Sequence, residues 1–132
     1  MSDASDFPAD TPDEEPTGDG GCVRCYNIGD VMMFVVESKQ VYPKQVDEIL
    51  HIIRGRISEA AGPKVIVDLC NVEFVCSALI GGFVALHKLA HSRSGELKMC
   101  VADKQIMNTM KVLRLTDIIE IDDDVRALAS HF

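Results

Sequence analysis

Short apolar runs of strand character alternate with segments of helical periodicity through residues 22–132, and this alternation constrains the fold more than any other feature. The clearest strand covers residues 64–69, a continuous β-branched run typical of a strand that is buried on both faces. Such strands normally form a parallel sheet whose crossover helices cover its faces. The pattern therefore predicts an α/β protein with a mixed sheet.

The successive segments predict the element order β-β-α-β-α-β-α-β-α. A turn at Gly29 separates the first two strands, so these strands are expected to form an antiparallel hairpin. Pro43 suits the first position of the first helix, which is expected to end before Gly62. The predicted strands are 22–27, 31–37, 64–69, 97–101 and 118–121, and the predicted helices are 43–61, 77–92, 104–114 and 123–130.

Three of the predicted helices carry an apolar stripe that is expected to face the core. The first stripe is Val46, Ile49, Leu50, Ile53 and Ile57; the second is Leu79, Ile80, Phe83, Val84 and Leu86; the third is Ile106, Met110 and Leu113. Because 47% of the residues are hydrophobic, the chain can bury a core without the help of a disulfide or a metal.

Acidic residues are concentrated at the N-terminus. Residues 1–21 contain seven of the 21 acidic residues and no Lys or Arg, so they are predicted to be a disordered acidic tail before a single domain at 22–132. The rest of the chain holds 14 acidic and 13 basic residues and is nearly neutral. A nucleic-acid partner is not expected, because phosphate binding needs a basic surface.

The protein is expected to be cytoplasmic and not inserted in a membrane. Its apolar runs are far shorter than the roughly 20 residues that span a bilayer, and its N-terminus does not resemble a signal peptide. The five cysteines are an odd number and are expected to be reduced thiols. Cys22 and Cys25 form a lone CxxC motif, without the second ligand pair that a zinc site needs.

The remaining polar groups do not predict a catalytic or metal site. His87 and His91 have i, i+4 spacing but no evident third ligand. The three acids at 122–124 are expected to cap the last helix rather than to bind a cation. Asp68 ends a buried strand, a common place for a catalytic carboxylate, but no catalytic set or Gly-rich phosphate loop accompanies it. No enzyme activity, cofactor or metal is therefore expected.

Three stretches of the chain carry a resemblance to a known family. Residues 65–74 are a buried strand with the loop that leaves it, and residues 75–81 begin the second helix. Residues 113–122 precede a helix that contains the pair Ala127 and Leu128. In this order and spacing, the stretches resemble the STAS domain family, named for sulfate transporters and anti-sigma factor antagonists. The resemblance covers residues 22–131 and implies a STAS-like mixed sheet with covering helices.

The resemblance implies a protein–protein switch. Anti-sigma factor antagonists of this family bind a serine kinase that otherwise sequesters a sigma factor. The kinase phosphorylates a serine, which by position is Ser77 here, and a phosphatase removes the phosphate. Cys76 and Leu79 replace the family's Asp and Gly, which favours an alternative. In that alternative, a STAS module acts without phosphorylation as a scaffold or ligand-sensing subunit of a larger regulatory or transport assembly.

Ser77 can also be interpreted from its local sequence. It lies between an apolar loop and an apolar-periodic run, so it is predicted to be the N-cap of the second helix, with or without a switch function. A phosphate there would lie near free backbone amides. The partner-binding surface, on a monomer or weak dimer, is expected to include the loops 38–42 and 71–76 and the start of the second helix. Its predicted members are Gln40, Asn71, Val75, Cys76, Ser77 and Ala78.

Overall fold

The computed structural model describes residues 23–132, so the predicted acidic tail and Cys22 lie outside the described residues. The described residues form the predicted α/β fold with the predicted order of strands and α-helices. The strands are β1 (Val23–Ile28), β2 (Val31–Val36), β3 (Lys64–Asp68), β4 (Glu96–Cys100) and β5 (Ile121–Asp122). The helices are α1 (Pro43–Glu59), α2 (Ser77–Ser92), α3 (Lys104–Val112), the 3-10 helix η2 (Leu115–Asp117) and α4 (Val125–Ser130).

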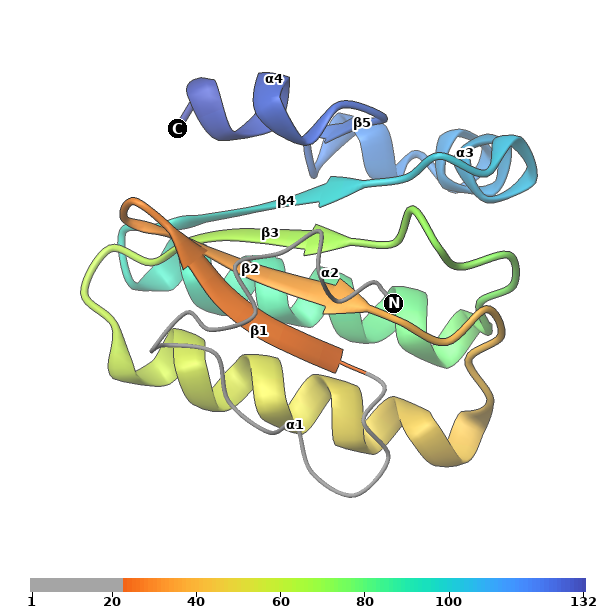
Figure 1. Ribbon diagram of the computed structural model, residues 1–132, viewed down its shortest axis with the longest axis horizontal. Helices are drawn as coiled ribbons and strands as arrows, with labels where there is room; N and C mark the ends of the chain where they lie inside the picture. The colour runs from red at the N-terminus through yellow and green to blue at the C-terminus, as the bar shows by residue number, and fades with distance from the viewer. Residues whose placement is uncertain (1–22) are drawn as a thin grey trace, which may run out of the picture.

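The five strands form one mixed sheet in the order β1-β2-β3-β4-β5 (Figure 1). β1 and β2 form the predicted antiparallel hairpin, whose turn contains Gly29 in the left-handed region, with φ of 61°. The pairs β2·β3, β3·β4 and β4·β5 are parallel. The carboxyl ends of β2, β3 and β4 therefore lie at one edge of the sheet, and the loops that follow these strands meet there.

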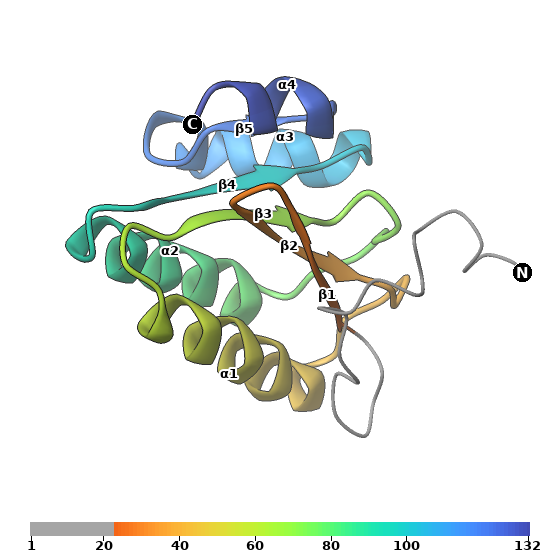
Figure 2. The same ribbon diagram turned by 60° about the vertical axis from the view of Figure 1, so that its left-hand side comes forward.

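α1 and α2 cover one face of the sheet (Figure 2). The side chain of Leu50 in α1 packs directly on Gly82 of α2, where a Cβ atom would collide with it. The predicted apolar stripes of α1 and α2 lie in this main core, although Leu50 and Val84 are only half-buried. The fully buried side chains of the main core include Ile49, Ile53, Ile57, Phe83 and Leu86 from the helices and Val65, Val67 and Leu97 from the strands.

The opposite face of the sheet is covered by α4, a helix of 6 residues (Figures 1 and 2). Leu128 of α4 packs with Met33 and Ile66 in a second, smaller apolar cluster. Lys98 of β4 is completely buried there, and its Nζ donates to the carbonyl oxygen of Leu128 at 3.1 Å. The same Nζ lies 3.2 Å from a carboxylate oxygen of Glu120, so the charge is paired.

Two predictions near the C-terminus were wrong in detail. The segment 118–121 was expected to be a strand, but β5 has only two residues, and η2 takes up part of the preceding connection. Leu113 was expected to face inward but is 52% exposed. The reason for both is Arg114, whose φ of 62° lies in the left-handed region, ends the preceding helix and redirects the chain.

Candidate functional site

The two loops that were expected to form a binding surface lie side by side. The backbone N–H of Glu73 donates to the carbonyl of Lys39 at 2.7 Å, and that of Val41 donates to the carbonyl of Phe74 at 3.2 Å. Gln40 and Phe74 form an isolated parallel bridge. These bonds join the loop after β2 to the loop after β3, immediately before α2 begins.

Ser77 is the first residue of α2, and its side chain is exposed. The prediction that Ser77 is the N-cap was wrong, because Cys76 occupies the cap position with an extended backbone at φ −92° and ψ 162°. The carbonyl of Cys76 accepts from the N–H groups of Leu79 and Ile80, whereas its thiol forms no capping bond. Ser77 thus lies in the first turn, where backbone amides have no partner within the helix and the helix dipole is positive.

Apolar side chains are exposed next to Ser77. Phe74 is 52% exposed and Tyr42 is 50% exposed, and the two residues come from the two joined loops. Val75 and Cys76 are half-buried against the main core, and Ala78 is exposed. We call Gln40, Tyr42, Phe74, Val75, Cys76, Ser77 and Ala78 the α2-start surface.

Sequence reasoning included Tyr42 and Phe74 only as members of two loops. The available signal was a single aromatic residue in each of the two loops. Tyr42 also organises the start of α1, because its backbone N–H donates to the side-chain oxygen of Gln45 at 2.9 Å, and its hydroxyl donates to Gln40. The exposed ring of Tyr42 is therefore held by a structured loop.

Asn71, the remaining predicted binding residue, is exposed and lines a hollow of about 460 Å³ at the carboxyl edge of the sheet. The hollow lies among the three loops that follow β2, β3 and β4. It is lined by Glu37, Lys39, Cys70, Asn71, Val72, Glu73, Ala102 and Asp103. Three carboxylates and one lysine make this lining acidic. A smaller hollow of about 140 Å³ separates the loop at Phe74 from α3.

The histidines of α2 and the acidic residues before α4, which were also noted in the sequence, take part in local contacts. The rings of His87 and His91 stack on α2 with centroids 6.3 Å apart, and in the described part of the chain neither belongs to a cluster of three potential metal ligands. Asp124 caps α4, as expected, by accepting from the N–H of Arg126 at 2.9 Å. Asp122 accepts from the N–H of Asp123, and this hydrogen bond lowers the pKa of the Asp122 carboxyl.

Comparison with known proteins agrees with this architecture. The family model described as STAS domain matches residues 27–128, which is most of the chain, so the protein belongs to the STAS domain family. No curated protein sequence matches the chain significantly. None of the helices between residues 23 and 132 is long and apolar enough to cross a membrane.

Two solved structures share this fold at low sequence identity. One is an anti-sigma-factor antagonist (STAS) domain protein from Planctomyces limnophilus, with a TM-score of 0.72 and 19% identity, covering 82% of this chain and 95% of that one. The other is an anti-sigma factor antagonist from Mycobacterium paratuberculosis, with a TM-score of 0.73 and 12% identity, covering 82% of this chain and 90% of that one. At these identities, the likeness establishes the fold.

Proposed function

We propose that this STAS protein is an anti-sigma factor antagonist that binds an anti-sigma serine kinase through the α2-start surface and is released when Ser77 is phosphorylated. The observation that carries the proposal is the exposed hydroxyl-bearing residue at the first turn of α2, next to exposed apolar side chains. The proposed setting is the cytoplasm, with the protein as a monomer or weak dimer and a phosphatase that restores the unphosphorylated form.

The position of Ser77 suits a phosphate in the free protein. A phosphoserine carries about −1.5 to −2 charges at neutral pH. In the first turn of α2, this charge would lie near unpaired backbone amides and the positive end of the helix dipole. Because the Ser77 side chain is exposed, the phosphate could also keep most of its hydration. Phosphorylation is therefore expected to leave the fold intact.

The same phosphate would oppose docking. A partner that covers Phe74 and Tyr42 would also remove water from Ser77, and a dianion buried against an apolar surface loses hydration without gaining a counter-charge. Changing the bound fraction from about 99:1 to about 1:99 requires about 5.5 kcal/mol of differential binding. The desolvation of one unpaired dianion is of this size or larger.

The test is a pull-down from the lysate of the source cells with three full-length variants, followed by mass spectrometry. Wild-type protein and Ser77→Ala are expected to recover an ATPase of the histidine-kinase-like fold, whereas Ser77→Asp is expected to lose it. Ser92→Asp is the matched control, because Ser92 is an exposed serine at the other end of the same helix. Circular dichroism should show that all variants are folded.

Equal recovery of the same partners by wild-type protein and Ser77→Asp would contradict the proposal. That result would favour the alternative of a non-phosphorylated scaffold or ligand-sensing subunit. Loss of the partner from both Ser77→Asp and Ser92→Asp would also count against a specific switch, because it would reflect added charge anywhere on α2.

A further inference from the structure

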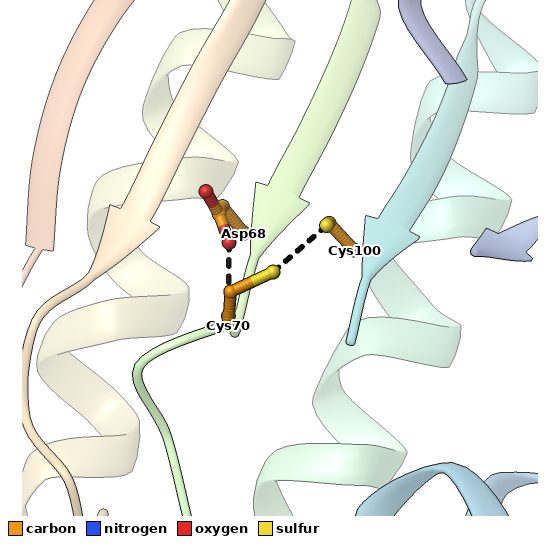
Figure 3. Close-up of side chains that lie close together, drawn as sticks. All are labelled: Asp68, Cys70 and Cys100. Carbon is orange, nitrogen blue, oxygen red and sulfur yellow. Dashed lines mark hydrogen bonds between the residues drawn. The ribbon is translucent and has the colours of Figure 1, made fainter. Parts of the chain in front are cut away.

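A cluster of three potential metal ligands lies beneath the carboxyl edge of the sheet. Asp68 ends β3, Cys70 follows two residues later, and Cys100 ends β4 (Figure 3). Asp68 and Cys100 are paired in the parallel register, so their side chains lie on the same face of the sheet, the face covered by α4. The two Sγ atoms are 2.9 Å apart, and all three donor atoms lie within 4.8 Å of one another.

This cluster concentrates groups that can carry negative charge. The Asp68 carboxylate is half-buried, accepts from the backbone N–H of Cys70 at 2.9 Å, and forms no ion pair with a cation of residues 23–132. A bound divalent cation would stabilise the carboxylate and both thiolates, because it would place positive charge between these donor atoms.

We propose that Asp68, Cys70 and Cys100 form a binding site for Zn²⁺. Zinc takes thiolate sulfur at about 2.3 Å and carboxylate oxygen at about 2.0–2.2 Å, which places tetrahedral donors about 3.5–3.8 Å apart. All three donor atoms lie within 4.8 Å of one another, but the two sulfur atoms, 2.9 Å apart, are closer than this range. Side-chain rotations that separate the sulfur atoms would bring the cluster to tetrahedral spacing. Two sulfur donors favour zinc over the oxygen-seeking cations Mg²⁺ and Ca²⁺.

Three protein ligands leave the fourth position of a tetrahedral ion for water or for a ligand from outside the cluster. Cys70 also lines the 460 Å³ hollow, so this hollow offers a route between the cluster and solvent. The carboxylates of Glu37, Glu73 and Asp103 outnumber the lining Lys39 and the Arg24 that pairs with Glu37 at 3.0 Å, and the remaining negative charge would attract a cation. Binding converts two thiols to thiolates and releases two protons for each Zn²⁺ bound, so affinity should increase with pH.

A disulfide is the competing use of the same two sulfur atoms. Its formation needs an oxidant and begins from a thiolate. Here Cys100 is completely buried, which restricts the access of an oxidant to its thiol. Zinc needs no oxidant and itself provides the charge that stabilises the thiolates.

The test uses the full chain, reduced and stripped of metal, titrated with ZnCl₂ in competition with a chromophoric chelator. Wild-type protein should bind one equivalent, and Cys70→Ala and Cys100→Ala should each weaken binding at least about tenfold. Cys76→Ala is the matched control, because Cys76 is half-buried outside the cluster, and it should bind like wild type. Substitution of Co²⁺ should give a sulfur-to-metal charge-transfer band that both cluster variants lose.

Circular dichroism checks that each variant is folded. Asp68→Asn provides a further control, because this nearly isosteric change keeps both thiols; it should weaken zinc binding less than the loss of a cysteine does. Absence of stoichiometric binding by the wild type would overturn the proposal. Binding that survives the double variant Cys70→Ala, Cys100→Ala would also overturn it, since the ion would then lie elsewhere, for example at Cys22 and Cys25. Formation of a Cys70–Cys100 disulfide in air, with no zinc bound after reduction, would assign the pair to redox chemistry instead.

Discussion

The two faces of the sheet are stabilised in different ways. One face packs against α1 and α2 through a continuous set of apolar side chains, such as Ile53 and Phe83. The other packs against the short helix α4 and buries polar groups, among them Lys98 and the thiol of Cys100. The first face therefore provides most of the stability, whereas the second is held by a few specific polar contacts that can be adjusted or used for chemistry.

The largest expected effect is on the α1/α2 face. Ile53→Ala should lower the free energy of unfolding by about 3 kcal/mol, because Ile53 is completely buried and its side chain would leave a cavity. Leu128→Ala on the other face should cost less, since α4 has 6 residues at the end of the chain and can shift to fill the space. Urea unfolding measures both values, and an equal or larger loss for Leu128→Ala would show that the α4 face stabilises the protein as much as the α1/α2 face does.

The next effect concerns the buried lysine. Lys98→Ala should destabilise the protein by about 2 kcal/mol, because it removes the buried aliphatic stem as well as the partner shared by the carbonyl of Leu128 and the carboxylate of Glu120. Lys98→Met keeps the volume of the aliphatic stem and should cost less. Thermal unfolding of both variants is the measurement. If Lys98→Met were as destabilising as Lys98→Ala, the charge and hydrogen bond would matter more than packing.

A smaller effect should distinguish α3 from α4 by what the loss of the N-cap side chain does to each helix. Asp103 caps α3 by accepting from the N–H groups of Gln105 and Ile106, and Asp124 caps α4 in the same way. Asp103→Ala should lower the global stability by about 1 kcal/mol, since α3 packs into the main core. Asp124→Ala should mainly speed amide hydrogen exchange within α4. Unchanged exchange in α4 would show that this helix opens only with the whole domain.

The smallest effect is a pH dependence at the hairpin. The hydrogen bond from Lys64 Nζ, at 2.7 Å, lowers the pKa of the exposed Asp30 carboxyl. Because the pKa is lower in the folded state, this contribution is present above the carboxyl's usual pKa and is lost as the pH falls through the folded value. The melting temperatures of wild type and Asp30→Asn should therefore converge in acid, and added salt should reduce their difference near neutral pH. A difference that persists in acid would exclude this ion pair as its cause.

The same contrast explains what could be predicted from the sequence. The packing of α1 and α2 on one face was largely predictable, because their apolar residues repeat with helical spacing. α2 has the predicted bounds, Ser77–Ser92. The burial of Lys98 was not, since it depends on a carbonyl 30 residues away in the sequence. The cluster of Cys70 and Cys100 likewise requires the register of two strands. Contacts between residues so far apart in the chain leave no periodic pattern in the sequence from which they could be predicted.

The proximity of the two loops to the start of α2 was predictable, but the details of their structure were not. The loops at Gln40 and Asn71–Cys76 could be placed near Ser77, because loops after parallel strands share one edge of the sheet. The cap was placed one residue too late, since a hydroxyl suggested a cap where the backbone of Cys76 takes that position. The exposure of Phe74 depends on how its loop pairs with the loop after β2 and could not be read from composition.

The most direct test of the proposed switch is the affinity of the purified kinase partner for the full chain with serine or phosphoserine at position 77. Both forms can be prepared at full length, with circular dichroism as the folding control. The proposed switch predicts that phosphoserine weakens binding by about 10⁴-fold, equivalent to about 5.5 kcal/mol. Equal affinities for the two forms would contradict it and would leave the first turn of α2 without a regulatory function.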